Sequence, residues 1–188
     1  AFHFGDVEIA LAAASHDGES IHIRGVRGML DRAGVGEDAL RCGPAVEGKI
    51  TIGPPIANNC SGKHAALLAM CAHEGVDHEG YLDSNHPIER RLLAQLLRDF
   101  DRATSTPMAI DGCGMPIFGA SLREIALAYA RLAWRPDAAI ERVTSAMTAQ
   151  PNYVGGSVQN LDTTIIAGSA GHILGKIGAE GLHADCVI

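Results

Sequence analysis

The octapeptide Asn58-Asn59-Cys60-Ser61-Gly62-Lys63-His64-Ala65 places a thiol, a hydroxyl, an amine and an imidazole within one short segment. Apolar residues follow it at helical spacing as far as Gly75. We therefore predict a helix from this motif to Gly75, with Asn59 or Ser61 as its N-cap. The reactive groups then crowd a helix N-terminus, where backbone N–H groups near Ser61 can stabilise an oxyanion.

A second motif, Asp111-Gly112-Cys113-Gly114-Met115-Pro116, holds a thiol between two glycines, which let a ligand approach the backbone closely. Cys60 and Lys63 share a helix face, and Cys113 can meet them from a loop. Zinc suits such thiolates. A lysine ligand is unusual, because deprotonating an amine with a pKa of about 10.4 costs roughly 4.6 kcal/mol at pH 7. The alternative for these cysteines is the common role of a small buried hydrophobe.

Ser15 and Ser61 are the candidate nucleophiles, since a serine that attacks an acyl carbon needs a base within reach. Four side chains can act as that base: Lys63, His64, His16 and Lys176. The alternative is that Ser61 caps the helix and Ser15 caps a turn. Asp111 can orient a substrate amine, although aspartate before glycine is also ordinary turn chemistry.

A third motif, Lys176-Ile177-Gly178-Ala179-Glu180-Gly181, couples an amine and a carboxylate in a strand-like segment. Such a segment can hold a proton carrier near a substrate. The alternative is a hairpin turn with a solvated ion pair.

Composition limits the classes of function. The chain has 188 residues, of which 47% are hydrophobic, enough for one domain with a sizeable core. A net charge of -7 without a block of Lys or Arg argues against nucleic acid and anionic membranes as partners. The sequence shows neither a membrane-spanning apolar run nor a secretion signal. The five scattered cysteines favour reduced thiols and a cytoplasmic location.

Hydrophobic periodicity predicts an α/β protein. Besides the helix that ends at Gly75, helices are predicted at 6–14, 19–33, 87–100, 121–135 and 137–150. Strands are predicted at 49–52, 163–167, 172–177 and 186–188. Residues 101–108 are predicted to form a polar linker.

Four motifs occur here in the order seen in the rhizobial-type L-asparaginase II family. They are Ala14-Ser15-His16-Asp17-Gly18-Glu19 and the three motifs at 58–65, 111–116 and 176–181. The chain resembles this family over nearly its whole length, including Gly80-Tyr81-Leu82 and His86-Pro87 between the motifs. The cysteine–lysine motif at 58–65 is specific, and the other three support it.

The resemblance implies hydrolysis of L-asparagine to L-aspartate and ammonia by a protein that is usually a homodimer. The implied fold is similar to serine β-lactamases and glutaminases, with a sheet flanked by helices. By motif match, the residues that resemble the family's zinc ligands are Cys60, Lys63 and Cys113. Those that resemble its substrate-site residues are Ser15, His64 and Asp111. Lys176 resembles the second lysine of its paired Ser-Lys arrangement, which makes Ser15 and Lys176 the catalytic candidates.

The family's nucleophilic serine belongs to a Ser-x-x-Lys element upstream of the motif at 14–19, and these 188 residues contain no Ser-x-x-Lys. We therefore expect residues 1–188 to be a single asparaginase II-like domain without its N- and C-terminal parts, and the nucleophile to lie outside them. Two alternatives are a non-catalytic domain that binds zinc or an amino acid, and a β-lactamase-like hydrolase of another amide.

Overall fold

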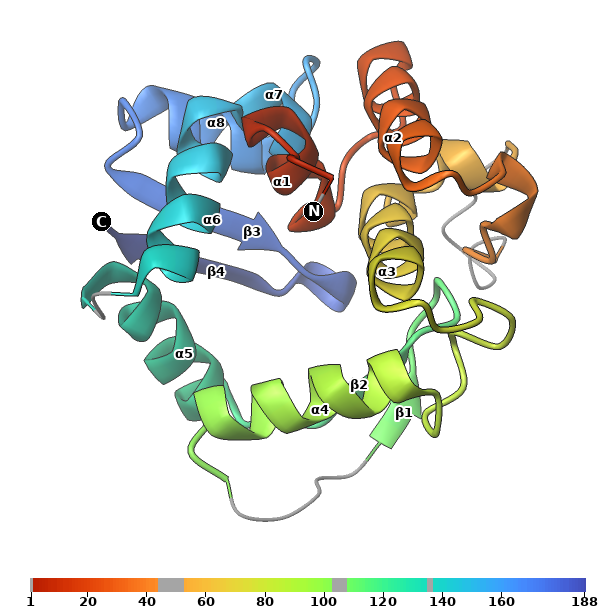
Figure 1. The fold of residues 1–188 in the computed structure, drawn as a ribbon. Coiled ribbons are helices and arrows are strands. Elements are labelled where there is room, and N and C mark those ends of the chain that lie inside the picture. Colours follow the sequence, from red (N-terminus) through yellow and green to blue (C-terminus); the bar gives the residue numbers. More distant parts are fainter. Residues whose placement is uncertain (1, 44–52, 103–107, 135–136) are drawn as a thin grey trace.

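The computed structural model describes residues 2–43, 53–102, 108–134 and 137–188. Within them the chain is mixed α/β (Figure 1). The helices are α1 (Asp6–Ala12), α2 (Ser20–Ala33), α3 (Ser61–Glu74), α4 (Pro87–Asp99), α5 (Leu122–Trp134), α6 (Ala138–Ala149), α7 (Pro151–Val154) and α8 (Leu161–Gly168). The strands are β1 (Met108–Ile110), β2 (Pro116–Phe118), β3 (Ile173–Ile177) and β4 (His183–Val187). Short 3-10 helices are η1 (Glu37–Ala39), η2 (Pro55–Ala57) and η3 (Ala179–Gly181).

The predicted helices are confirmed, and local signals set their ends. Gly34 ends α2 in the left-handed conformation, with φ of 68°. Pro87 occupies the first turn of α4. Ser121 and Glu124 form the reciprocal capping box that opens α5. The Asp137 carboxylate accepts two backbone N–H groups at the start of α6.

The start of α3 differs from the prediction, because its N-cap is Cys60 and neither Asn59 nor Ser61. Asn58 satisfies the first N–H groups instead. Its Oδ1 accepts the Cys60 N–H at 2.8 Å, and its carbonyl oxygen accepts the Ser61 N–H at 2.9 Å. These two N–H groups are therefore already bonded within the chain, and the oxyanion site near Ser61 stays a prediction for the N–H groups that follow them.

The predicted strand at 163–167 is wrong, because these residues belong to α8. Asn160 explains the difference. Its side-chain oxygen accepts the Thr163 N–H at 3.3 Å, and its carbonyl oxygen accepts the Thr164 N–H at 3.0 Å. An N-cap of this kind starts a helix even in a β-branched segment.

The other two C-terminal strands are confirmed as a hairpin. The prediction at 172–177 matches β3, and the prediction at 186–188 overlaps β4, which begins earlier. β3 and β4 are antiparallel, with a register that runs from Ile173 opposite Val187 to Ile177 opposite His183.

A shorter antiparallel hairpin, β1 with β2, was not predicted from the sequence. Its turn carries the motif at 111–116. The strand predicted at 49–52 lies outside the described residues, as does most of the linker predicted at 101–108.

Two hydrophobic cores meet at α1. The first core joins α1, α2, α3 and α4 and includes Leu11, Val26, Met29, Leu30, Leu68 and Ile88. The second core joins α1, α6, α7, α8 and the β3–β4 hairpin and includes Ala10, Met147, Val154, Ile166, Leu174 and Cys186. Adjacent residues of α1, Ala10 and Leu11, are thus fully buried in different cores. The chain that leaves α1 toward Ser15 therefore starts at the junction of the two halves (Figure 1).

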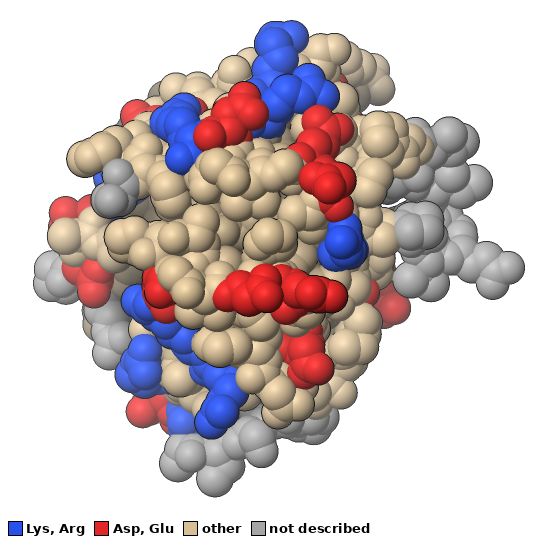
Figure 2. Space-filling model, turned by 45° about the vertical axis from the view of Figure 1, so that its right-hand side comes forward, with Lys and Arg blue, Asp and Glu red and all other residues tan. Residues whose placement is uncertain are grey.

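The mixed α/β class is confirmed. In the described residues the strands form two separate two-stranded sheets, and helices α5, α6 and α8 pack on the β3–β4 hairpin (Figure 1). The likeness to serine β-lactamases stays a prediction. Figure 2 shows one face of the molecule, on which acidic and basic side chains are interspersed. Among the described helices, none has both the length and the apolar character needed to cross a membrane.

Candidate active site

The first turn of α3 is held against the backbone of α1. A Cβ added at Gly62 would lie 2.3 Å from the carbonyl oxygen of Leu11, closer than any real contact. The glycine in the cysteine–lysine motif is thus required by this close approach of two helices. The packing places Cys60 and Lys63 beside the segment that leads from α1 to Ser15.

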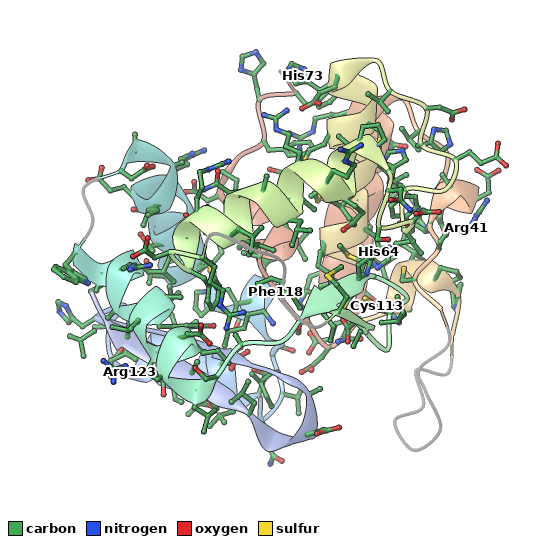
Figure 3. The ribbon with its side chains drawn as sticks, turned by 90° about the horizontal axis from the view of Figure 1, so that it is seen from below. Arg41, His64, His73, Cys113, Phe118 and Arg123 are labelled. Atoms are coloured by element: carbon green, nitrogen blue, oxygen red, sulfur yellow. The ribbon has the colours of Figure 1, made fainter. Side chains whose placement is uncertain are left out.

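The β1–β2 turn brings the second thiol to the first. Asp111 N–H donates to Met115 O, and Gly114 N–H donates to Asp111 O, both at 2.8 Å. Gly114 has φ of 90°, which favours glycine. The turn directs Cys113 toward the start of α3, and Figure 3 shows it beside His64. The ligand atoms of Cys60, Asp111 and Cys113 all lie within 4.8 Å of one another.

The two thiols have opposite acidities. The pKa of Cys60 is lowered to about 7, mainly by a hydrogen bond with Cys113 and also by attraction to Lys63, while burial opposes the shift. The same hydrogen bond and burial raise the pKa of Cys113. Cys60 is therefore the thiol that becomes a thiolate near neutral pH, and Cys113 is the thiol that keeps its proton.

Lys63 and Asp111 complete this cluster. Lys63 Nζ lies 3.4 Å from Asp111 Oδ2, which also accepts a hydrogen bond from Cys113 Sγ at 3.1 Å. Burial lowers the pKa of Lys63, but attraction to Cys60, Cys113 and Asp111 outweighs it, so the net pKa is raised. Burial raises the pKa of Asp111, but hydrogen bonding with Cys113 and attraction to Lys63 leave it lowered.

This donor set fits zinc. Tetrahedral zinc with Zn–S bonds of about 2.3 Å holds two thiolates roughly 3.8 Å apart, within the spread of the cluster. Cys60 and Cys113 supply the soft donors, and Lys63 and Asp111 are the neighbouring nitrogen and oxygen donors. The structure thus brings together the three predicted zinc ligands and adds Asp111, which the sequence assigned to substrate binding.

His64 is fully buried and held by a tyrosine from the α3–α4 connection. Its Nδ1 lies 2.7 Å from the Tyr81 hydroxyl, which accepts the Arg41 N–H at 2.9 Å. The hydroxyl proton is therefore free to bond Nδ1, which leaves the ring proton on Nε2. Among the described residues, no atom lies in hydrogen-bonding geometry to Nε2. His64 is nevertheless close enough to Cys113 to lower the pKa of that thiol. This geometry makes His64 a buried neighbour of Cys113, and its substrate-binding role stays a prediction.

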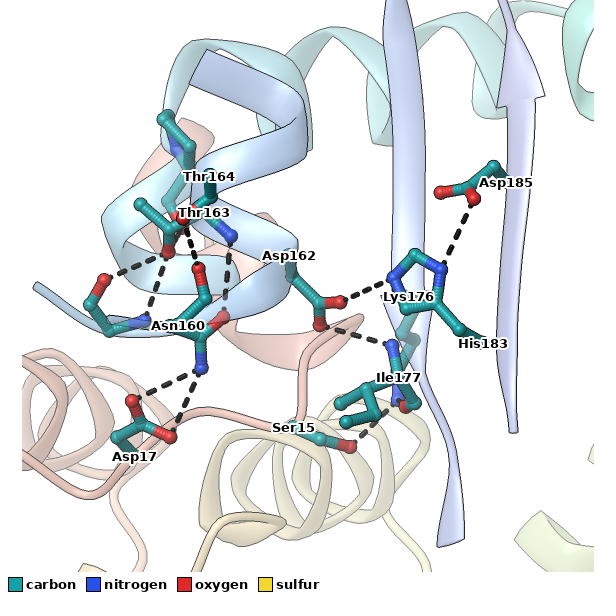
Figure 4. Close-up of polar contacts among 12 residues, drawn as sticks. Ser15, Asp17, Asn160, Asp162, Thr163, Thr164, Lys176, Ile177, His183 and Asp185 are labelled. Atoms are coloured by element: carbon teal, nitrogen blue, oxygen red, sulfur yellow. Dashed lines mark hydrogen bonds and ion pairs between the residues drawn. The ribbon is translucent and has the colours of Figure 1, made fainter. Parts of the chain in front are cut away.

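Ser15 and Lys176 meet directly across the molecule, as Figure 4 shows. Lys176 Nζ donates to Ser15 Oγ at 2.7 Å and to the carbonyl oxygen of Ile177 at 3.1 Å. The serine follows α1 and the lysine lies on β3, so the contact joins the two halves of the fold. Both side chains are only partly exposed.

The environment of Lys176 lowers the pKa of its amine. Burial is the main cause of its lowered pKa, and repulsion from Lys63 adds to it. Cys60, Asp162 and Asp111 oppose this shift by attraction. The Ser15–Lys176 pair and the thiol cluster therefore share one electrostatic environment, as expected for two parts of one site.

His16 and Ser61 also form a serine–histidine pair, at 3.2 Å between Oγ and Nε2. However, His16 Nδ1 accepts the Gly18 N–H at 3.1 Å, so the proton of the neutral ring is on Nε2 and is donated to Ser61. Both side chains are completely buried. Among the candidate bases, His16 is thus unsuited to activate Ser61, and the pair fixes the Ser15 segment to α3 instead.

This buried imidazole predicts how stability depends on pH. Burial and then the stacked His22 ring lower the pKa of His16 to about 3. The unfolded chain binds a proton near pH 6.5 and the folded chain does not, so stability falls as pH drops below 6.5 and stops falling near pH 3. Between pH 6.5 and 4.5 we expect a loss of about 2.3 kcal/mol from this residue, because half of the unfolded chains already carry the proton at pH 6.5.

Urea unfolding of the wild type and of His16→Gln across this pH range measures the effect. Glutamine does not titrate, so the unfolding free energy of His16→Gln should depend on pH less steeply, by about 1.2 kcal/mol per pH unit averaged from pH 6.5 to 4.5. Equal slopes in the two proteins would contradict the assignment of a neutral buried His16.

Several polar residues of the site region were missed from the sequence. Tyr81 positions His64, His22 stacks on His16 with ring centroids 4.6 Å apart, and Asp162 accepts a backbone N–H of β3. Of the three, Tyr81 alone had a signal in the sequence, through the Gly80-Tyr81-Leu82 motif. The other two lie on helical faces where nothing local separates a buried polar group from a surface one.

Comparison with known proteins shows the family of the chain. The family model described as L-asparaginase II matches residues 1–187, nearly the whole chain. A search of curated proteins finds none that matches.

Proposed function

Because the chain belongs to the L-asparaginase II family, we propose that it hydrolyses the side-chain amide of L-asparagine to L-aspartate and ammonia through a Ser-Lys acyl-enzyme mechanism. The family itself points to asparagine hydrolysis. The observation that carries the mechanism is the 2.7 Å contact of Lys176 Nζ with Ser15 Oγ, together with the lowered pKa of that lysine.

Lys176 acts as the base in this mechanism. Its neutral amine takes a proton from the Ser15 hydroxyl, which takes the proton of the attacking serine outside residues 1–188. The other candidate nucleophile is Ser15 itself, attacking the amide carbon as Lys176 takes its proton. The carbon–nitrogen bond breaks, and Lys176 returns the proton to the leaving ammonia. Water then hydrolyses the ester to release aspartate. The buried setting of Lys176 keeps more of its amine neutral near pH 7 than in a free lysine.

Zinc is the proposed cofactor, held by Cys60, Lys63 and Cys113 with Asp111 beside them. When bound, zinc can polarise a carbonyl oxygen as a Lewis acid. The cluster residues have further tasks of their own. Lys63 and Asp111 are partly exposed, so they can contact the charged groups of the amino acid substrate. We further propose a cytoplasmic homodimer that binds neither nucleic acid nor membrane.

A substrate comparison tests this proposal. Ammonia release from L-asparagine should exceed that from L-glutamine by at least about tenfold, because one additional methylene changes where the amide lies relative to Lys176. A β-lactam should not be hydrolysed. The zinc content of the same sample should be measured by metal analysis.

The two alternatives give different results. A non-catalytic zinc or amino-acid-binding domain would bind zinc and asparagine without releasing ammonia. A β-lactamase-like hydrolase would turn over the β-lactam faster than asparagine.

A further inference from the structure

Asp162 is a buried carboxylate that binds the edge of β3. It is fully buried at the start of α8. Its Oδ2 accepts the Ile177 N–H at 3.1 Å, and its Oδ1 lies 3.0 Å from His183 Nε2 (Figure 4). A buried carboxylate persists only where its oxygens are bonded in this way. The bond to β3 is made at the residue next to Lys176.

His183 connects this carboxylate to a second one. Its Nδ1 lies 3.2 Å from Asp185 Oδ2, so both ring nitrogens face carboxylate oxygens. The ring crosses the hairpin over Gly175, where an added Cβ would lie 2.3 Å from Asp185 Oδ1 and 3.1 Å from His183 Cε1. The glycine therefore leaves the space through which β4 reaches Asp162 on α8.

The strand register places the side chains of His183 and Asp185 on one face of the hairpin and the Lys176 side chain on the other. Asp162, His183 and Asp185 together form the carboxylate–histidine network. Gly175 lies opposite Asp185, and Ile177 lies opposite His183. Successive residues of a strand point to opposite faces, so Lys176 projects away from the face that carries His183 and Asp185. Lys176 reaches Ser15 on its own side. The carboxylate–histidine network thus acts on Lys176 through the β3 backbone.

We propose that Asp162 is a positioning residue for Lys176. With His183 and Asp185 it fixes the edge of β3 at Ile177, so that Lys176 Nζ is held within hydrogen-bond distance of Ser15 Oγ. This inference rests on the proposed function, in which Lys176 is the base. A base misplaced by 1 Å loses much of its effect, so a second layer of bonds around it has catalytic consequences.

Asp162 also contributes charge. The charged and titratable groups that influence Lys176 are Cys60, Lys63, Asp111 and Asp162. Asp162 stabilises the protonated amine and so raises its pKa, whereas burial and Lys63 lower it. Removing this one carboxylate should therefore increase the neutral fraction of Lys176 at a given pH.

Two substitutions separate bonding from charge. Asp162→Ala leaves the Ile177 N–H unpaired, and kcat should fall about tenfold or more at nearly unchanged KM. In Asp162→Asn the amide oxygen can still accept from Ile177 and the amide NH2 can donate to His183, so most of kcat should return. Because the charge is gone, the acid limb of the kcat profile should move to lower pH.

Lysine labelling gives a readout that does not need turnover. The chain has only three lysines, at 49, 63 and 176, so acetylation by acetic anhydride can be followed separately for each by peptide mass spectrometry. In Asp162→Asn the pH midpoint for Lys176 labelling should fall. Asp185→Asn is the matched control for charge: it keeps the Asp162 carboxylate and its bond to Ile177, and Asp185 is not among the groups that shift the pKa of Lys176, so the pH midpoint of Lys176 labelling should equal that of the wild type.

The proposal is overturned if Asp162→Ala keeps the wild-type kcat, or if Asp162→Asn leaves the Lys176 midpoint unchanged. Should Asp162→Ala fail to fold, the Asp162→Asn midpoint still decides. A wild-type protein that releases no ammonia would reject the proposed function, while the labelling of Lys176 would still test the contact with Asp162.

Discussion

Cys60→Ser is expected to lower zinc affinity by at least about 100-fold and to lower the rate of ammonia release from L-asparagine by a similar factor. The reason lies in acidity. The pKa of the Cys60 thiol is lowered to about 7, so the wild type presents a thiolate near neutral pH. A serine hydroxyl of similar size stays protonated there and is a much weaker ligand for zinc.

The measurement is a zinc titration followed by metal analysis after dialysis, together with the asparagine assay. Cys186→Ser is the matched control, because Cys186 is also buried but lies in the second core, with Leu174 and Ile166. It should lose some stability and keep its zinc. Equal zinc content in Cys60→Ser and the wild type would contradict a metal role for the cluster.

The zinc affinity of the wild type should also depend on pH, because ligands must lose their protons to bind. Affinity should rise as pH increases through about 7, where Cys60 becomes a thiolate. The same cluster raises the pKa of Lys63, so this amine holds its proton more tightly. A protonated amine cannot coordinate zinc, so low pH weakens binding at this ligand too. This dependence distinguishes thiolate coordination from adventitious binding to surface carboxylates, which are already ionised at pH 5.

The sequence predicted the thiols and the lysine of the site better than its histidines. Cys60, Lys63 and Cys113 were predicted to meet, because thiols and lysines are few and their motifs are dense. The structure brings them together with Asp111. His16 was a candidate base from the sequence, but its role depends on a Gly18 N–H that only the folded turn presents. Tautomer and burial are tertiary properties, so no local pattern reveals them.

The fold shows the same limit. The run Thr163-Thr164-Ile165-Ile166 has strong β propensity, yet it is helical because Asn160 caps it and Ile166 is buried in the second core. Caps and packing outweigh propensities of a few tenths of a kcal/mol per residue. In contrast, Gly34 and the Ser121–Glu124 box predicted their helix ends correctly, because those signals act within one turn of chain.

Ser15→Ala and Lys176→Met should each lower kcat for asparagine hydrolysis by about 10³-fold. The double variant should have about the same kcat as each single variant. The lysine is useful only while it can exchange a proton with the serine, and the serine only while a base is present. Groups that act as one unit are not additive, whereas two independent contributions would multiply to about 10⁶-fold.

Folding must be unchanged for this comparison to be valid. Methionine keeps the length and most of the apolar stem of Lys176, so its unfolding midpoint should stay close to that of the wild type. Lys176→Arg provides a second control, since it keeps the hydrogen bond to Ser15 but cannot lose its proton near neutral pH. If Lys176→Arg retains activity, Lys176 serves only to hold the serine. If Lys176→Arg is inactive but folded, catalysis needs an amine at position 176 that can lose its proton. Burial lowers the pKa of Lys176 and so makes this proton easier to lose.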